Sequence, residues 1–348
     1  MKFYVPNVIF GAGKAPMADI IKNEIDILED GLLYCYPEIL KILLKDKTTG
    51  KNILWATKDY EHNGEGFGEC DEIKMYCITG LFATEIQPRA TKSKEVQTMR
   101  IKAKAEVFTP CWICNEQNNL VDDAWFGRKN VFNTPNGQAW VTTSEPIVFD
   151  EIKTWQKYVD SKRLEITCGE APYLVSRYDA ATGSYLPILG RIGLLDRKLR
   201  VICENCDDEN EWYKWTIRAY QSVYGYEFQG DSLLIARENL FYSFIDYYKY
   251  KFGTTPSLDK LKRIANIISW NIWQMDGLTC TVPYSCHSVE VRNIQASLFD
   301  DGTVEHKPCP GCEKNDMFSH NGIYCKIKDW RDNSPLLYVS ILQRRKSK

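Results

Sequence analysis

The sequence has no long apolar run. No window of 18 residues is free of polar side chains, and the longest apolar stretches break at Arg191, Asn266 and Asn271. A membrane-spanning helix needs about 20 predominantly apolar residues, so we expect no membrane partner. Residues 1–10 also lack the basic segment, apolar run and small-residue cleavage site of a secretory signal. Together these absences predict a cytoplasmic protein.

Histidine is scarce, and neither sign of charge dominates. The 348 residues include four histidines, 44 lysines and arginines, and 46 aspartates and glutamates, which gives a formal net charge of −2. Such a chain has no global attraction for nucleic acid, so a role of that kind must rest on local patches. The thirteen cysteines are an odd number, so disulfides cannot pair all of them. In a reducing compartment we expect free thiols or metal ligands.

The chain also lacks a Gly-x4-Gly-Lys-Ser/Thr loop, which argues against an ATP-driven motor. It contains no internal repeat and no low-complexity tract, and its 44% apolar and 26% charged residues are ordinary for a folded protein. We expect an N-terminal region of unassigned role at 1–88 and a main domain at 89–343. Within that domain, the polar residues 280–325 form an insert rich in Cys and His.

Hydrophobic periodicity predicts an α/β fold. In the N-terminal region we expect two short helices within 15–47 and strands at 53–57 and 74–79. In the main domain we expect strands at 163–168, 199–203 and 222–227, and helices at 209–221, 232–248 and 258–269. Strands that alternate with helices are typical of a mostly parallel sheet.

A glycine and two acids close three segments of this pattern. Gly169 follows the first strand of the main domain, Glu227 ends a later strand, and Asp276 ends a further segment. Ligands of open parallel sheets bind beyond the carboxyl ends of the strands. A glycine there lets a ligand approach the backbone, and acids can accept hydrogen bonds from ribose hydroxyls and from an adenine amine. The pattern predicts a nucleoside cofactor, although acids at strand ends also serve as helix caps.

Four motifs follow one another in the order of a known family. They are Phe108-Thr109-Pro110, then Glu165-Ile-Thr-Cys168-Gly169, then Gly225-Tyr-Glu227 with Ala236-Arg237-Glu-Asn239-Leu240, and finally Asn271-Ile-Trp-Gln-Met-Asp276-Gly-Leu278. In this set the chain resembles the S-adenosylmethionine-dependent DNA adenine-N6 methyltransferases of restriction-modification systems. The resemblance covers about residues 85–330. It implies a Rossmann-like class I methyltransferase sheet, preceded by the small N-terminal region and carrying the Cys/His-rich insert near its end.

The resemblance also implies roles for individual residues. Thr109 and Pro110 would pack around the methionine part of the cofactor, Glu227 would bind its ribose, and Asp276 would bind its adenine amine. The full set of implied cofactor-binding residues is Phe108, Thr109, Pro110, Glu165, Cys168, Gly169, Glu227 and Asp276. Double-stranded DNA would be the substrate, and a restriction or methylase subunit would be the partner.

The chain departs from the family at the motif that holds the methyl acceptor. The family places a flipped adenine against Asn/Asp-Pro-Pro-Tyr/Phe, but this sequence has no Pro-Pro, Asn-Pro or Asp-Pro pair. Tyr284 is the nearest candidate for the catalytic aromatic, and Ala171 replaces the second glycine of the cofactor loop. Three functions therefore stay open. They are a methyltransferase or methylase subunit, a cofactor- and DNA-binding subunit that cannot methylate alone, and a restriction endonuclease component.

Basic residues are densest at 89–104. The candidate contacts with DNA phosphates are Arg89, Lys92, Lys94, Arg100, Lys102 and Lys104. A solvated helix face is the competing interpretation of such a run. The nuclease hypothesis rests on Glu-x-Lys pairs at Asp71-Glu72-Ile-Lys74 and Asp150-Glu151-Ile-Lys153, which exposed charged turns explain as well.

Five cysteines and three of the four histidines lie within 280–325. Cys309-Pro-Gly-Cys312 has the spacing of a tight turn that presents two thiolates to one tetrahedral metal. The expected ligands are Cys286, Cys309, Cys312 and Cys325, and His287, His306 and His320 could each replace one of them. A zinc ion there would be structural and would stabilise a polar insert. Free thiols are the competing interpretation.

Overall fold

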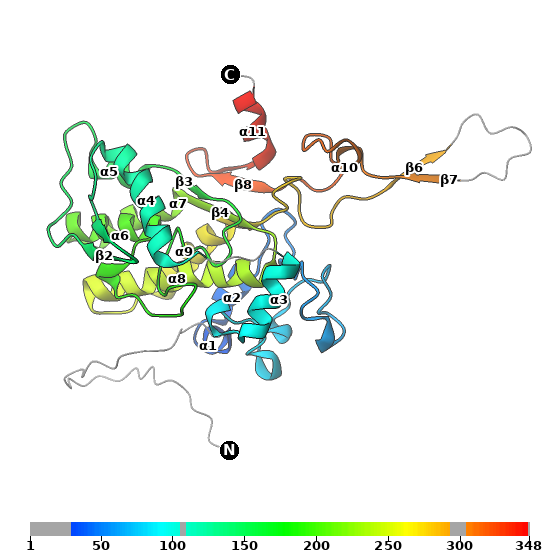
Figure 1. Ribbon diagram of the computed structural model, residues 1–348, viewed down its shortest axis with the longest axis horizontal. Coiled ribbons are helices and arrows are strands. Elements are labelled where there is room, and N and C mark those ends of the chain that lie inside the picture. Colours follow the sequence, from blue (N-terminus) through cyan, green and yellow to red (C-terminus); the bar gives the residue numbers. More distant parts are fainter. Residues whose placement is uncertain (1–28, 105–108, 293–303, 347–348) are drawn as a thin grey trace, which may run out of the picture.

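The computed structural model describes residues 29–104, 109–292 and 304–346 (Figure 1). Within these ranges the α-helices are α1 (Glu29–Cys35), α2 (Pro37–Leu43), α3 (Lys94–Lys104), α4 (Cys111–Phe126), α5 (Trp155–Asp160), α6 (Leu194–Asn205), α7 (Glu209–Gln221), α8 (Gly230–Phe252), α9 (Leu258–Asn271), α10 (Pro310–Lys314) and α11 (Tyr338–Lys346). The strands are β1 (Asn133–Asn136), β2 (Ala139–Thr142), β3 (Arg163–Glu165), β4 (Val223–Glu227), β5 (Ile272–Gln274), β6 (Val289–Arg292), β7 (Val304–Lys307), β8 (Lys326–Asp329) and β9 (Ser334–Leu337).

The expected parallel sheet is present in a small form. β3, β4 and β5 lie in that order and pair in parallel, with Glu165 opposite Gly225 and Glu227 opposite Gln274. The other strands of the described ranges form three separate antiparallel pairs, β1–β2, β6–β7 and β8–β9. The protein is therefore a mixed α/β structure in which one three-stranded sheet brings the carboxyl ends of β3, β4 and β5 to a single edge.

Each face of this sheet is covered by a different part of the chain. Because side chains alternate along a strand, Val223 of β4 faces the main core, which the long helices α6 to α9 also build. Tyr224 and Tyr226 belong instead to a second core, formed with Trp273 and with Tyr338 of the C-terminal segment. Burial on both faces explains why β4 reads as a nearly continuous apolar strand.

The N-terminal region contributes to the main core. Residues from Leu32 to Ile86 join it beside residues 131–272, and α2 packs against α9. The fully buried Arg237 of α8 anchors this contact, because its guanidinium donates to the carbonyl oxygens of Leu43 and Lys45. It also donates to the carbonyl oxygen of Ile272 at 2.8 Å and thereby links β5, α8 and the end of α2.

Most of the strongly periodic segments have the expected structure. The helices predicted at 209–221, 232–248 and 258–269 are α7, α8 and α9, and the strand predicted at 222–227 is β4. The strand predicted at 199–203 is wrong, because this segment is the last part of helix α6. Leu195, Leu199 and Ile202 are buried there at helical spacing, and a five-residue apolar run does not distinguish the two structures.

The two strands predicted in the N-terminal region are also wrong. Residues 53–56 run antiparallel to 69–73 through isolated bridges and backbone hydrogen bonds, such as Ile73 N–H to Ile53 O at 2.8 Å. The positive φ of Ala56, +50°, is incompatible with a continuing strand. The segment 74–79 contains the 3₁₀ turn Met75–Cys77 in place of a strand.

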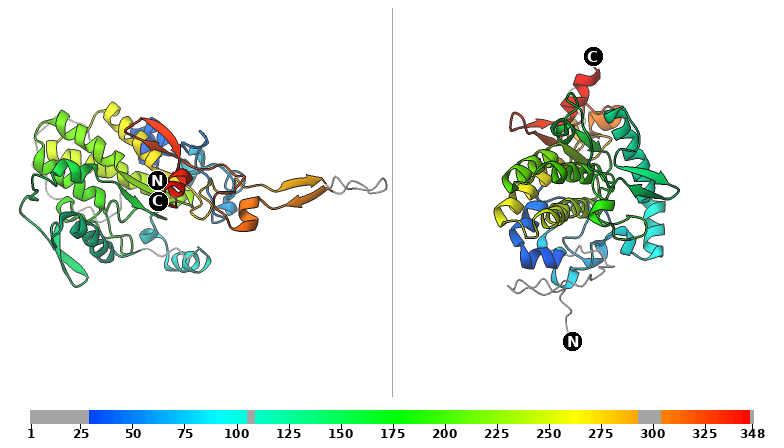
Figure 2. Two further views of the ribbon diagram at one scale, coloured as in Figure 1. Left: turned by 90° about the horizontal axis from the view of Figure 1, so that it is seen from above. Right: turned by 90° about the vertical axis from the view of Figure 1, so that its left-hand side faces the viewer.

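Two features at the C-terminal end stand apart from the helical body. Figures 1 and 2 show the β6–β7 hairpin projecting away from that body, with α10 at its base.

No helix within the described ranges combines the length and apolar character that a bilayer span requires.

Candidate functional site

Glu227 lies at the carboxyl end of β4, where sequence reasoning expected the cofactor. One carboxylate oxygen accepts a hydrogen bond from the backbone N–H of Gly169 at 2.8 Å, and the other accepts from those of Phe228 and Gln229. The side chain is 9% exposed, and burial raises the pKa of Glu227 although these three N–H groups oppose the shift. A carboxylate has about four acceptor positions, so one remains for a ligand hydroxyl.

The loop after β3 has a backbone that favours glycine. Thr167, Gly169 and Ala171 all have positive φ, at 46°, 53° and 62°. Ala171 occupies the position of the second glycine in the resembling family, and it keeps the left-handed conformation that a glycine would adopt freely. Gly225 on β4 allows the close approach of this loop, because a Cβ atom at Gly225 would lie 3.2 Å from the Cys168 sulfur.

Glu165 and Cys168 have internal roles in this loop. The Glu165 carboxylate accepts from the backbone N–H groups of Tyr173 and Leu174, at 3.3 and 3.2 Å. Burial raises the pKa of Glu165 to about 8, which favours its protonated form near neutral pH. Burial also raises the pKa of the Cys168 thiol well above its usual range, which disfavours the reactive thiolate form.

The Phe-Thr-Pro segment meets the same loop. Pro110 is the N-cap residue of α4, which begins directly after this motif. Burial raises the pKa of Tyr173 in this loop, while the nearby Thr109 side chain opposes the shift. Phe108 lies outside the described residues.

Helix α4 is held in place by buried polar contacts. Arg197 of α6 donates to the Asp122 carboxylate at 2.6 Å and to the amide oxygens of Asn115 and Asn119. All four side chains are buried. The helix therefore presents Thr109 and Pro110 from a rigid support.

Asp276 follows β5 and lies in a tight turn. One of its carboxylate oxygens accepts from the backbone N–H of Leu278 at 2.8 Å, while its backbone bridges to Thr281. The next residue, Gly277, packs on Tyr226, where a Cβ atom would lie 2.9 Å from the ring. Asp276 is partly buried, and within the described residues its second carboxylate oxygen accepts no hydrogen bond.

Tyr284 projects from the segment that follows this turn. Its ring packs edge-on against Phe228, with centroids 5.7 Å apart, so it lies next to the Glu227 end of β4. Its hydroxyl donates to Glu69 at 3.1 Å. Burial and the Glu69 carboxylate raise the pKa of Tyr284 to about 12. Tyr284 as a residue is 47% exposed, so part of its ring is accessible.

The basic stretch is divided between interior and surface. Arg89 is buried, and its backbone N–H donates to Glu170 at 2.6 Å. Arg100 is also buried and pairs with Asp59 and Asp231, while the Lys92 ammonium lies 3.7 Å from Asp231. Of the six expected phosphate contacts, Arg89 and Arg100 are thus buried, and Lys92 and Arg100 lie beside an internal carboxylate.

The other three basic residues of this stretch belong to α3. Lys94 and Lys102 are exposed on α3. Lys104 is the last residue of α3, and its side chain lies outside the described part of the chain. The surface of α3 therefore offers two described lysines to an anionic partner.

Asp231, in the first turn of α8, is the buried acid of an ion-pair cluster that sequence reasoning missed. It is fully buried and accepts hydrogen bonds from Arg100 at 2.9 Å and from the Tyr60 hydroxyl at 2.8 Å. Burial alone would raise the pKa of Asp231, but Arg100 and Lys92 outweigh that effect and hold it well below its usual range. The available signal was an acid directly before the helix predicted at 232–248.

Replacing Asp231 by asparagine is expected to lower the free energy of unfolding by about 3 kcal/mol at pH 7, because Arg100 and Lys92 would lose their buried counter-charge. The depressed pKa makes this stabilisation complete above the unfolded-state value near 4 and absent at pH values below the folded-state pKa. Urea titrations at pH 7 and pH 3 measure it. An equal stability difference at both pH values would contradict this assignment.

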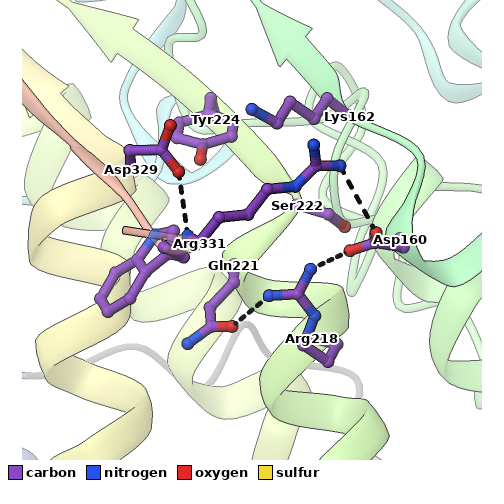
Figure 3. A pocket seen from close by; sticks show the side chains of 9 residues that line it. Asp160, Lys162, Arg218, Gln221, Ser222, Tyr224, Asp329 and Arg331 are labelled. Carbon is purple, nitrogen blue, oxygen red and sulfur yellow. Dashed lines mark hydrogen bonds and ion pairs between the residues drawn. The ribbon is translucent and has the colours of Figure 1, made fainter. Parts of the chain in front are cut away.

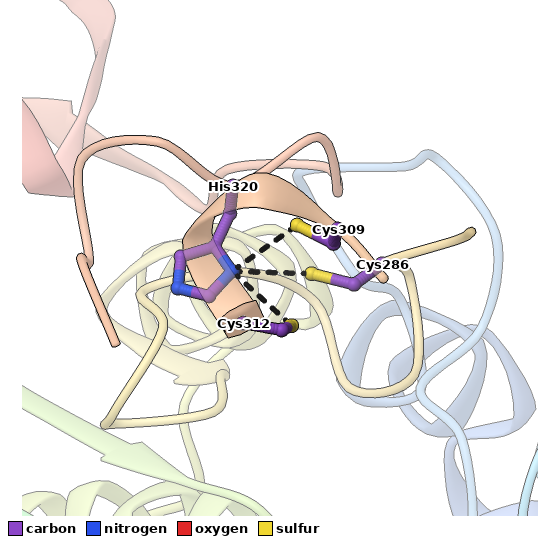
Figure 4. Close-up of side chains that lie close together, drawn as sticks. All are labelled: Cys286, Cys309, Cys312 and His320. Carbon is purple, nitrogen blue, oxygen red and sulfur yellow. Dashed lines mark hydrogen bonds between the residues drawn. The ribbon is translucent and has the colours of Figure 1, made fainter. Parts of the chain in front are cut away.

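The Cys/His-rich segment contains a compact donor set. Cys286, Cys309, Cys312 and His320 form the Cys3His cluster, whose ligand atoms all lie within 4.8 Å of one another (Figure 4). The three sulfur atoms are 3.5, 3.6 and 3.6 Å from Nδ1 of His320. Burial opposes ionisation of Cys309, but backbone N–H groups, chiefly that of Asn321, lower its pKa to about 6. This cluster could hold a metal ion.

Three of the four cysteines expected as ligands are therefore together, and Cys325 is not. Cys325 is fully buried in the second core, and its thiol donates to the carbonyl oxygen of Gln274 at 3.3 Å. His320 occupies the fourth position instead. His287 and His306, the two further histidines that the sequence offered as ligands, are exposed and lie outside the cluster.

The Glu-x-Lys pairs are engaged in local contacts. Glu72 accepts from the backbone N–H of Asn52 at 2.8 Å, and Asp150 caps the turn that leads to Lys153. Among the described residues, the Cys3His cluster is the one group of three or more potential metal ligands that lie close together. The nuclease hypothesis therefore has no assembled metal site in this part of the chain.

A separate polar pocket lies at the opposite edge of the sheet, near the amino ends of β3 and β4 (Figure 3). Asp160 binds Arg218 there and lies 3.8 Å from Arg331, while Lys162 and Tyr224 line the same pocket. Both arginines point toward the same aspartate, so their charge is partly compensated. The position is remote from the strand ends that carry Glu227 and Asp276.

Comparison with models of protein families, with curated proteins and with solved structures found no match for this chain.

Proposed function

We propose that this chain binds S-adenosylmethionine at the carboxyl ends of β3, β4 and β5 and serves as a DNA adenine-N6 methyltransferase or methylase subunit. The observation that carries the proposal is the 2.8 Å contact between Glu227 and the Gly169 N–H at this edge. It joins the glycine loop and the strand-end acid, two elements that a nucleoside cofactor needs together. The consecutive strand order is also that of one half of a doubly wound, Rossmann-like sheet.

The residues at this edge fit the nucleoside part of such a cofactor. Glu227 retains one acceptor position for a ribose hydroxyl, and Asp276 retains a carboxylate oxygen for the adenine amine. Thr109 lies near Tyr173 of the same loop, and Thr109 and Pro110 would border the methionine part. When bound, S-adenosylmethionine supplies an activated methyl group to this edge.

The acceptor side of the proposed reaction is less complete. Tyr284 offers a half-exposed ring beside Phe228 on which a flipped adenine would stack. The chain lacks the Pro-Pro-Tyr element that would hold the exocyclic amine. This combination supports a subunit that binds the cofactor and stacks the base, with a restriction or methylase partner completing the site on double-stranded DNA.

Zinc is the metal that we propose for the Cys3His cluster. Soft thiolates with one imidazole favour zinc over magnesium or calcium. With Zn–S near 2.3 Å and Zn–N near 2.05 Å, a tetrahedral site has S–N edges of about 3.6 Å. The observed separations of 3.5 to 3.6 Å agree with that value. With no ligand position left for water, this zinc is structural.

Calorimetric titration with S-adenosylmethionine tests the cofactor site. The wild type is expected to bind, and Glu227→Ala is expected to weaken binding at least tenfold, because it removes the carboxylate that would accept from the ribose. Glu151→Ala is the matched control, since Glu151 is an exposed loop carboxylate elsewhere. Absence of binding by the wild type would refute the proposed function.

Transfer of labelled methyl groups to mixed duplex DNA separates the remaining functions. A methyltransferase would label adenine when alone, whereas a subunit would do so only with the products of neighbouring genes. DNA cleavage that requires a divalent metal, but no methyl donor, would favour a nuclease instead. Lys94→Ala with Lys102→Ala should lower DNA affinity most at low salt if α3 meets the phosphates.

A further inference from the structure

The ligands of the Cys3His cluster connect both ends of the β6–β7 hairpin to one point. Cys286 precedes β6, Cys309 follows β7, and Cys312 and His320 come from α10 and the loop behind it. We propose that zinc in this cluster is a clamp: it closes the base of the hairpin and holds the loop of Tyr284 against the Glu227 end of β4. The role of Tyr284 rests on the proposed function, whereas the clamp rests on the geometry alone.

Hydrophobic packing holds this segment only in part, because Phe318 and Tyr324 are partly buried against the second core. Between residues 284 and 324, Cys309 is the one buried apolar side chain among the described residues, and its sulfur is a ligand. A polar segment of this size buries too little apolar surface to fix one conformation. Structural zinc sites supply folding free energy to such segments directly. We therefore expect the metal to supply much of the folding free energy of this segment.

Two glycines let the ligands converge. A Cβ atom at Gly311 would lie 2.6 Å from Cγ of His320, and one at Gly322 would lie 2.9 Å from the Cys286 sulfur. Neither glycine has a positive φ, so close approach and not backbone strain requires glycine there. The chain is thus adapted to bring Cys286 and His320 together.

Hydrogen bonds around the cluster also join the segment of Cys286 to the loop of His320. Asn321 donates through its backbone N–H to the Cys309 sulfur at 3.2 Å and through its side chain to the carbonyl oxygen of His287 at 2.7 Å. The His287 N–H donates back to the Asn321 side chain. Bonds of this kind orient metal ligands and stabilise thiolates.

The clamp extends to Tyr284, which is two residues before Cys286. Tyr284 has a positive φ of 58°, which surrounding contacts must impose on a residue of its size. The neighbouring Ser285 accepts from the Ile323 N–H at 3.0 Å and so ties the loop to the segment after His320. Release of the metal would free Cys286 and the segment after His320. The Tyr284 ring could then move away from Phe228.

Zinc content and amide hydrogen exchange test the clamp on the full chain. Wild type purified without chelator should carry one zinc per chain, and Cys312→Ser should carry less than a tenth of that. Cys70→Ser is the control, because Cys70 is an exposed cysteine outside the cluster. In the variant, and in wild type treated with chelator, amides at 284–292 and 304–324 should exchange at least tenfold faster. Those of β4 and α8 should stay unchanged.

The outcomes separate the clamp from the proposed function. Wild type without zinc, or equal exchange at 284–292 with and without zinc, would overturn the clamp. Acceleration that spreads to β4 and α8 would overturn it as well, because the metal would then support the whole fold. If zinc is present and exchange responds locally, but S-adenosylmethionine does not bind, the clamp stands and the proposed function fails.

Discussion

Replacing Arg237 by methionine is expected to lower the free energy of unfolding by about 4 kcal/mol. The fully buried guanidinium donates to carbonyl oxygens of Leu43, Lys45, Ser269 and Ile272. Methionine fills similar space but donates no hydrogen bond, so these acceptors would lose their charged partner at about 1–3 kcal/mol for each one left unsatisfied. Urea denaturation at pH 7 measures the loss.

The control for this variant is Arg263→Met on α9, where the side chain is exposed. It should change stability by less than about 0.5 kcal/mol. Arg237→Lys should recover only part of the loss, because one ammonium cannot reproduce a planar fork of donors. A stability of Arg237→Met within error of Arg263→Met would contradict the anchoring role of Arg237.

The position of Arg237 explains one motif that sequence reasoning recognised without a role. In the run Ala236-Arg237-Glu-Asn239-Leu240, Arg237 holds the N-terminal region. Asn239 donates to the carbonyl oxygen of Glu170 at 3.1 Å and to the Tyr178 hydroxyl at 3.0 Å. Helix α8 thus holds the N-terminal region through Arg237 and the glycine loop through Asn239.

Elements with long periodic patterns were predictable, and short ones were not. The pattern over α8 and α9 extends through many turns, whereas residues 199–203 offer one short apolar run that fits a strand or a helix. The predicted strand ends at Gly169, Glu227 and Asp276 do lie at one sheet edge, because β3, β4 and β5 are parallel.

Contacts between distant parts of the chain decided what sequence reasoning missed. Arg100 looked like a surface cation because its partner Asp231 is 131 residues away. Local charge density cannot reveal such pairing. The same limit applies to the metal ligands: spacing identified Cys309 and Cys312, but the fold determines that His320 is nearby and that Cys325 points into the second core.

Stability should also depend on pH through Glu165, with the opposite sign to Asp231. Burial raises the pKa of Glu165 to about 8, against about 4.3 in an unfolded chain. Between these values the unfolded chain releases a proton that the folded protein retains, so the folded state loses stability as pH rises. The loss through this group is complete above about pH 8 and is on the order of 5 kcal/mol.

Glu165→Gln should remove that dependence, because its amide oxygen can still accept from the Tyr173 and Leu174 N–H groups but carries no charge. Wild type and variant should be similarly stable at pH 5, and the variant should be more stable at pH 8 by up to about 4 kcal/mol. Urea titrations at both pH values, with Glu151→Gln as the exposed control, measure the difference. Glu227 also has a raised pKa, so part of the wild-type slope should persist in the variant. Parallel stability curves for wild type and Glu165→Gln would show that Glu165 is not the buried acid that destabilises the folded protein at high pH.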